Sequence, residues 1–234
     1  MMDLPLNNPD IRSGAEIRSV LADPDCSCDG PLYEMYRGIA CSEEDRQWLA
    51  EHQVRYDVTR IFPKTICREL IKTKGHYHPI SPDGLAYPEI YEVLEGEAYY
   101  LLQKRDLTDI ILVRAEKGDL ILIPPGYGHV TINPGKETLT MANLVSSAFA
   151  SEYLPYEQMR GAAYYLFADG TMKKNPAYPP DIPEIRIIDA TGTTLSEPFP
   201  DKALYKCVGD ELRVRFLNQP KEFEEQYNSL CLFT

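Results

Sequence analysis

The sequence lacks the features that would assign it to several common protein classes. No stretch of its 234 residues approaches the roughly 18 apolar residues of a transmembrane helix. Its first ten residues, MMDLPLNNPD, contain no basic region followed by an apolar run. Cationic residues are outnumbered: the sequence has 24 Lys and Arg against 36 Asp and Glu, which gives a net charge of −12. We therefore expect a cytoplasmic protein that binds neither nucleic acid nor membrane.

Cysteines at metal-binding or redox spacing are also lacking. The six cysteines form no Cys-x-x-Cys, and Cys26-x-Cys28 has no second pair at zinc-finger spacing. In a reducing compartment we expect these cysteines to be free thiols. A small redox or metal clip at Cys26 and Cys28 is the alternative.

Histidine is scarce, yet three of the four histidines lie in two short segments. These segments are TKGHYHPISPDGLAYPEIYEVLEGE at 73–97 and GDLILIPPGYGHVTIN at 118–133. On a β-strand His76 and His78 would point to the same side, and Glu89 and His129 can join them. Three imidazoles and a carboxylate suit Fe, Mn, Ni or Zn and leave positions open for substrate or water. For His76 and His78 alone, a surface pair on an ordinary strand is the alternative.

Both segments carry motifs of a known superfamily. The second segment resembles the second cupin motif, whose intervals are matched by Gly118, Pro124, Gly126, His129 and Asn133. The first resembles the first cupin motif through His76-x-His78, Glu89 and Gly96, with a longer insertion, PISPDGLAYP, that we interpret as a loop. Within the superfamily, three short segments resemble those of the cupin-type glucose-6-phosphate isomerases. They are TKGHYH at 73–78, EIY at 89–91 and LLQ at 101–103.

This resemblance implies an enzyme that interconverts glucose 6-phosphate and fructose 6-phosphate in glycolysis and gluconeogenesis. It implies one divalent metal per subunit, Fe first with Mn, Ni or Zn as alternatives, held by His76, His78, Glu89 and His129. Glu89 and Tyr91 would be catalytic. The substrate would be contacted at its phosphate by Tyr33, Thr59, Thr73 and Gly75, and by Tyr153 from the active-site lid. A homodimer is expected. The alternatives are another metal cupin, such as an Fe(II) dioxygenase, or a non-catalytic sugar-binding cupin.

The hydrophobic pattern favours a mainly β fold. From Val54 onward, short segments alternate with period two and are separated by turns, which predicts a sandwich or barrel. The resemblance specifies a cupin double-stranded β-helix, a jelly-roll-like small barrel, with a few peripheral helices. Local predictions are helices at 11–21, 42–53 and 221–230, an edge strand at 32–38, a strand at 65–73 and a hairpin turning at Asp169-Gly170.

We divide the chain into three parts. Residues 1–53 form an amino-terminal segment that wraps the core, and residues 54–176 form the cupin barrel. Residues 177–234 lie beyond the resemblance and form an extension that packs on the barrel or on a dimer partner. The extension could cover a sheet edge, hold a second subunit or carry an extra function, in that order.

Overall fold

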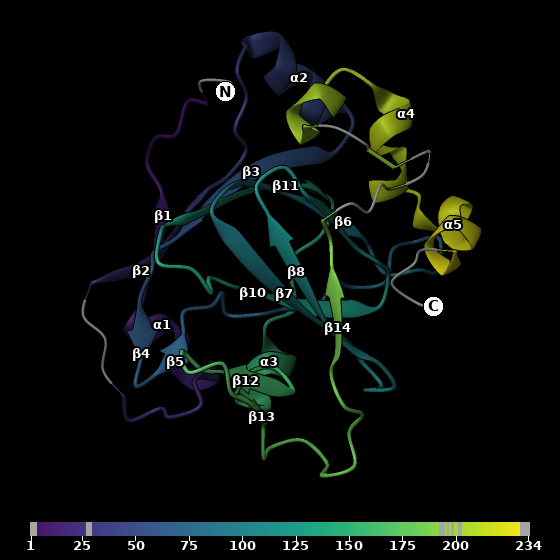
Figure 1. The fold of residues 1–234 in the computed structure, drawn as a ribbon. Coiled ribbons are helices and arrows are strands. Elements are labelled where there is room, and N and C mark those ends of the chain that lie inside the picture. Colours follow the sequence, from purple (N-terminus) through teal and green to yellow (C-terminus); the bar gives the residue numbers. More distant parts are fainter. Residues whose placement is uncertain are drawn as a thin grey trace.

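The structure is a computed structural model that describes residues 4–26, 30–191, 195, 197, 199–200 and 203–229. Two β-sheets dominate it (Figure 1). The larger sheet has the antiparallel strand order β1-β2-β3-β11-β6-β9. Its strands are β1 Asp10–Ser13, β2 Pro31–Tyr36, β3 Val54–Ile61, β11 Leu139–Ser146, β6 Glu89–Glu95 and β9 Leu120–Ile123.

The smaller sheet has the order β10-β7-β8-β14. Its strands are β10 Tyr127–Ile132, β7 Glu97–Lys104, β8 Ile110–Glu116 and β14 Arg186–Asp189. An extended segment at 71–78 continues this sheet beside β10. Thr73 N donates to Thr131 O at 2.8 Å, and His129 N donates to His76 O at 3.0 Å.

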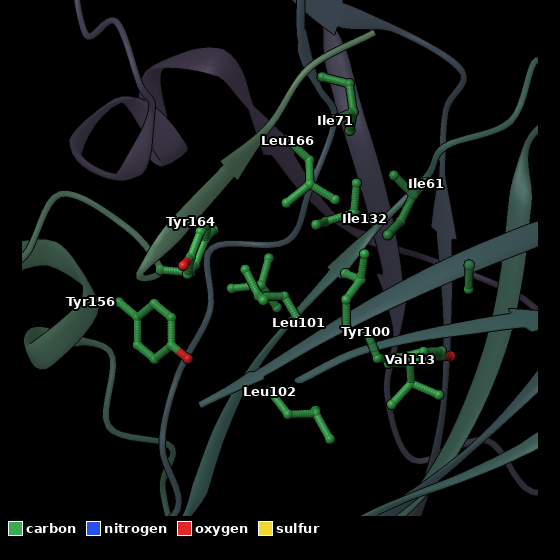
Figure 2. Close-up of a cluster of buried hydrophobic side chains, with 14 of the residues drawn as sticks. Ile61, Ile71, Tyr100, Leu101, Leu102, Val113, Ile132, Tyr156, Tyr164 and Leu166 are labelled. Atoms are coloured by element: carbon green, nitrogen blue, oxygen red, sulfur yellow. The ribbon is translucent and has the colours of Figure 1, made fainter. Parts of the chain in front are cut away.

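These strands make a jelly roll of two facing sheets. One layer contains β3, β11, β6 and β9, and the other contains segment 71–78, β10, β7 and β8. Along the chain the segments cross from one layer to the other at every step except the β7–β8 hairpin, as in a double-sheet jelly roll. The predicted mainly β cupin fold is confirmed, as two packed sheets. A buried cluster joins the sheets and the hairpin of β12 Tyr164–Leu166 and β13 Met172–Lys174 (Figure 2).

Helical segments are short and peripheral. They are α1 Gly14–Ile17, α2 Glu43–Glu51, α3 Leu154–Gln158, α4 Glu211–Val214 and α5 Glu224–Asn228, with 3-10 turns η1 Arg18–Val20, η2 Leu204–Cys207, η3 Arg215–Leu217 and η4 Pro220–Phe223. The helix predicted at 42–53 is confirmed, and its cap Ser42 accepts from Asp45 N at 3.0 Å. Within the described residues no helix is long and apolar enough to span a membrane.

Several local predictions were wrong. The predicted helix at 11–21 begins as β1 and becomes helical only from Gly14 to Val20. The segment at 32–38 is β2, which lies between β1 and β3 and is therefore not an edge strand. The strand predicted at 65–73 is broken into β4 Thr65–Ile66 and β5 Glu69–Leu70. Between them Cys67 and Arg68 have φ of 44° and 78°, a left-handed backbone that a strand cannot contain.

The hairpin at Asp169-Gly170 is present, and the terminal helix is α5, preceded by η4. Residue 230, the last of the predicted terminal helix, lies outside the described residues.

Two cysteines expected to be free are joined. A disulfide links Cys26, which follows the amino-terminal helical turn, to Cys67 in the β4–β5 turn. It closes a loop of 41 residues, so it restricts the unfolded chain. Cys28 and Cys231 lie outside the described residues. The alternative prediction of a redox or metal clip at Cys26 and Cys28 therefore falls partly outside them as well.

The extension packs on both sheets. β14 runs parallel to β8 and extends the smaller sheet at that edge. The helices α4 and α5, yellow in Figure 1, lie beside the larger sheet. There Leu204, Phe216, Leu217 and Tyr227 join Tyr56, Val58 and Leu144 in a second buried cluster on its outer face. The division at 53 and 176 stays a prediction.

Candidate metal centre

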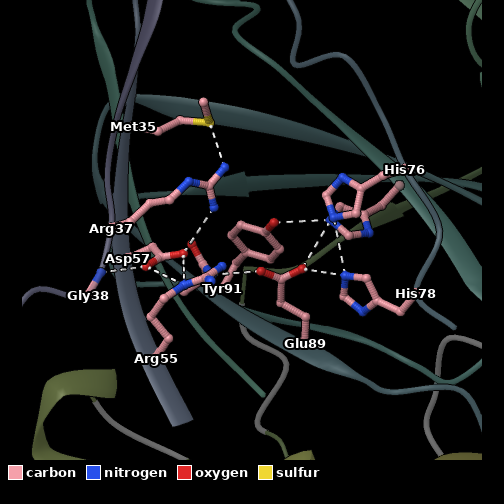
Figure 3. Close-up of polar contacts among 11 residues, drawn as sticks. Met35, Arg37, Gly38, Arg55, Asp57, His76, His78, Glu89 and Tyr91 are labelled. Carbon is pink, nitrogen blue, oxygen red and sulfur yellow. Dashed lines mark hydrogen bonds and ion pairs between the residues drawn. The ribbon is translucent and has the colours of Figure 1, made fainter. Parts of the chain in front are cut away.

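Four side chains from both layers converge between the sheets. His76 and His129 are bridge partners in the smaller sheet, and His78 lies two residues further along. Glu89 is the first residue of β6 in the larger sheet and points toward them (Figure 3). One ligand atom from each residue lies within 4.8 Å of all the others. The structure thus brings together the predicted metal ligands, and the ten-residue insertion between His78 and Glu89 does not separate them.

The geometry of this cluster fits a cation. Glu89 Oε2 lies 3.3 Å from His78 Nε2 and 3.2 Å from His129 Nε2, and His76 Nε2 lies 3.2 Å from His78 Nε2. Oε2 is buried and accepts no hydrogen bond of regular geometry from the described residues. A buried carboxylate oxygen without such a donor is costly. A divalent ion among these four atoms would satisfy it, and the donor set suits Fe, Mn, Ni or Zn.

The protonation states in the cluster are those a metal requires. Burial lowers the pKa of His76 well below its ordinary value and also lowers the pKa of His129. Burial acts to raise the pKa of Glu89, but the adjacent His129 and His78 hold it well below the usual value. The imidazoles of His76 and His129 are therefore neutral and the carboxylate of Glu89 is ionised at neutral pH, as coordination of a cation requires.

Two further groups orient the ligands. His78 Nδ1 lies 2.9 Å from the Tyr87 carbonyl, so it donates there and leaves Nε2 with its lone pair. Asn143 Nδ2 donates to Glu89 Oε1 at 2.7 Å, and both side chains are buried. Sequence reasoning missed Asn143, although an amide within the apolar strand LTMANLVS was a signal that could have indicated it.

Tyr91 lies against the cluster from β6. Its hydroxyl is 3.0 Å from His129 Nε2, and burial raises its pKa well above the ordinary value. The phenol is therefore protonated at neutral pH and can donate a hydrogen bond beside the candidate metal position.

The cluster opens into a cavity of 330 Å³. All five predicted substrate residues line it: Tyr33, Thr59, Thr73, Gly75 and Tyr153. The cavity wall also contains residues that sequence reasoning did not select: Arg37, Arg55, Asp57, Lys74 and Asn143.

Gly75 is required by packing at the cavity wall. Its φ is +81°, and a Cβ there would lie 2.6 Å from Tyr156 Cδ1 and 2.6 Å from Val130 Cγ2. Any side chain at this position would therefore displace the segment that leads into His76.

Comparison with known proteins identifies the family. The family model described as "Glucose-6-phosphate isomerase (GPI)" matches residues 13–182. The chain belongs to the glucose-6-phosphate isomerase family. It is 28% identical over 125 residues to glucose-6-phosphate isomerase of Thermococcus gammatolerans, covering 53% of this chain and 60% of the relative. It is 30% identical over 109 residues to that of Pyrococcus furiosus, covering 47% and 51%. The alignments thus span about half to three-fifths of the length of these relatives.

Solved structures similar to this chain have low sequence identity to it and low TM-scores. Momordica charantia 7S globulin has a TM-score of 0.38 at 17% identity, covering 54% of this chain and 32% of that chain. Lactobacillus farciminis oxalate decarboxylase has a TM-score of 0.39 at 15% identity, covering 53% and 31%.

Proposed function

We propose that this protein is a metal-dependent aldose–ketose isomerase that interconverts glucose 6-phosphate and fructose 6-phosphate. The convergence of His76, His78, Glu89 and His129 at one end of a polar cavity carries this proposal. Membership of the glucose-6-phosphate isomerase family supports the substrate and the reaction class.

The reaction moves a hydrogen between C2 and C1 of the open-chain sugar. By proton transfer it passes through an enediolate, whose negative charge must be stabilised. A divalent ion held by His76, His78, Glu89 and His129 would supply Lewis-acid stabilisation of this charge. A hydride shift from C2 to C1 is the competing mechanism.

Glu89 acts as a ligand and as the candidate base. Its Oε1 accepts from Asn143 and its Oε2 faces the imidazoles, so neither oxygen is directed freely into the cavity. Because a carboxylate engaged in this way is a weak base, we assign Glu89 first to holding the metal. The buried Tyr91 hydroxyl is placed to donate a hydrogen bond to a sugar oxygen.

The predicted phosphate contacts are neutral donors at the cavity wall. Thr73 Oγ1 accepts from Thr131 N at 3.0 Å, which leaves its own hydroxyl hydrogen available for a phosphate oxygen. Tyr33 lies next to this segment, because its hydroxyl accepts from Lys74 N at 3.3 Å. Thr59 and Tyr153 complete this wall.

The wider proposal covers metal, location and assembly. We propose Fe as the ion, with Mn, Ni and Zn as alternatives, and a cytoplasmic role in glycolysis and gluconeogenesis. A homodimer remains part of the proposal. Any second copy would have to pair elsewhere than on the outer face of the larger sheet where α4 and α5 pack, since the extension buries residues there.

The test is isomerase activity on fructose 6-phosphate under argon, with the metal-loaded protein. Glu89→Gln should reduce the rate by about 100-fold or more, whereas Glu95→Gln, at an exposed position of the same strand, should keep it. Equal rates for the two variants would refute the assignment of Glu89. A protein that is inactive under argon but consumes oxygen with another substrate would support the dioxygenase alternative, since the same donor set suits Fe(II).

A further inference from the structure

A pair of arginines lies in the cavity wall away from the histidines. Asp57, only 4% exposed, accepts from Gly38 N at 2.8 Å and from Arg55 Nε at 2.9 and 2.8 Å. Arg37 Nη1 lies 3.5 Å from the same carboxylate. Figure 3 shows the two guanidiniums around Asp57, with Tyr91 and Glu89 between them and the histidines.

The cationic side chains that line this cavity differ in how closely they are paired with carboxylates. Among the described residues that line it, the cationic side chains other than histidine are Arg37, Arg55 and Lys74. Lys74 Nζ is ion-paired with Glu157, and Arg55 Nε contacts both oxygens of Asp57. Arg37 has a longer contact with Asp57 and donates to a neutral partner, Met35 Sδ, at 3.3 Å. Because its contact with Asp57 is longer than that of Arg55 and its second partner is neutral, the charge of Arg37 is the least neutralised of the three and the most available to an anion.

The position of Arg37 suits a phosphate. Its guanidinium reaches Met35 (Figure 3), and Met35 pairs across the strands with Thr59, a predicted phosphate contact. Tyr33 and Met35 alternate on β2, Arg37 follows directly after the last residue of that strand, and all three line the same cavity. A phosphate monoester carries between one and two negative charges at neutral pH. The predicted contacts Tyr33, Thr59, Thr73 and Gly75 supply hydrogen bonds but no charge.

The spacing across the larger sheet suits an open-chain sugar. Val145 on β11 pairs with Arg55 on β3 and with Glu89 on β6. The backbones of Arg55 and Glu89 are therefore two strand spacings apart, about 10 Å, and Arg37 directly follows β2, which lies one strand beyond β3. Since the arginines and Glu89 line the same cavity, an extended hexose phosphate would lie with its carbonyl end toward the candidate metal position and its phosphate toward the arginines.

We propose that Arg37 binds the phosphate of the substrate and selects phosphorylated over free sugars, with Asp57 positioning its guanidinium. This inference rests on the proposed function for its substrate class. It adds a charged residue to a subsite for which sequence reasoning gave only neutral groups.

The test is direct binding of sorbitol 6-phosphate, a non-isomerisable hexitol phosphate, to the full-length protein held metal-free by a chelator. Calorimetry should show that Arg37→Gln weakens binding by about 10- to 100-fold, with Arg37→Lys between it and wild type. The matched control is Arg60→Gln. Arg60 has nearly the same exposure as Arg37, 41% against 40%, and also forms an ion pair, but it does not line the cavity. Thermal unfolding verifies that each variant is folded.

Kinetics separate this inference from the proposed function. If the protein is an isomerase, Arg37→Gln should raise the KM for fructose 6-phosphate with a smaller change in kcat. Binding by Arg37→Gln equal to that by Arg60→Gln, or no binding of sorbitol 6-phosphate by the wild type, would overturn the role of Arg37. A wild type that binds this ligand through Arg37 yet isomerises no hexose phosphate would overturn the proposed function and retain the phosphate site.

Discussion

Replacing Asn143 by alanine should weaken metal binding without touching a metal ligand. The side-chain amide donates to Glu89 Oε1 at 2.7 Å, and the two residues are 5% and 3% exposed, so water cannot replace the donor easily. Loss of such an outer contact costs about 10- to 100-fold in metal affinity, which is about 1.4 to 2.8 kcal/mol. Competition with a chromophoric chelator, under argon for Fe, measures this change.

The control is Asn175→Ala. Asn175, 1% exposed, also donates from Nδ2, but to the carbonyls of Met159 and Ala162 at 2.8 and 2.9 Å, and none of these residues lines the cavity. This variant should lose stability and keep the affinity for metal. Wild-type affinity in Asn143→Ala, or an equal loss of affinity in both variants, would refute the role given to Asn143.

Three further predictions concern the extension, the backbone and the mechanism. Asp109→Asn should destabilise the protein by about 1–2 kcal/mol at pH 7, because Asp109 accepts from Arg186 Nε and Nη2 at 3.0 and 2.9 Å. Burial opposes ionisation, but Arg186 keeps the pKa of Asp109 below its ordinary value, so this stabilisation is present above about pH 4 and is lost as the pH falls through the lowered pKa. Urea unfolding of the wild type and Asp109→Asn at pH 7 and pH 3 measures this contribution. A difference in free energy of unfolding that is as large at pH 3 as at pH 7 would contradict the prediction. Gly75→Ala should lower the free energy of unfolding by about 2–4 kcal/mol. Gly84→Ala, at a residue with φ of +100° but open space around an added Cβ, should lower it less. Equal melting temperatures for the two variants would contradict this prediction. Since both oxygens of Glu89 are engaged, isomerisation in D₂O should place little deuterium at C1 of the fructose 6-phosphate formed, and extensive deuteration by NMR would instead indicate proton transfer.

Most strands and the histidine pair were predictable because each depends on a short-range pattern, and the resemblance to the cupin motifs added Glu89 and His129. Period-two alternation and turn residues indicated most strands, and the spacing His76-x-His78 needs only a strand to place both imidazoles on one side. Glu89 was predictable despite the insertion before it, because the residues between His78 and β6 form a loop that leaves the strands in register.

Other features depend on contacts that no local pattern encodes. The disulfide joins Cys26 to Cys67 across 41 residues, and the turn that brings them together has two left-handed residues that are not glycine. Arg37 and Asn143 enter the cavity only because β2, β3, β11 and β6 lie side by side in one register. The parallel pairing of β14 with β8 likewise requires the tertiary structure.

The most direct test of the central claim is a metal titration of the chelated protein under argon, with fructose 6-phosphate as substrate. We expect no isomerase activity without metal, and a rise in activity that ends at one equivalent of Fe per chain, with His129→Ala giving no such rise. Isomerase activity that survives complete removal of metal, or no activity with Fe, Mn, Ni or Zn, would contradict the account.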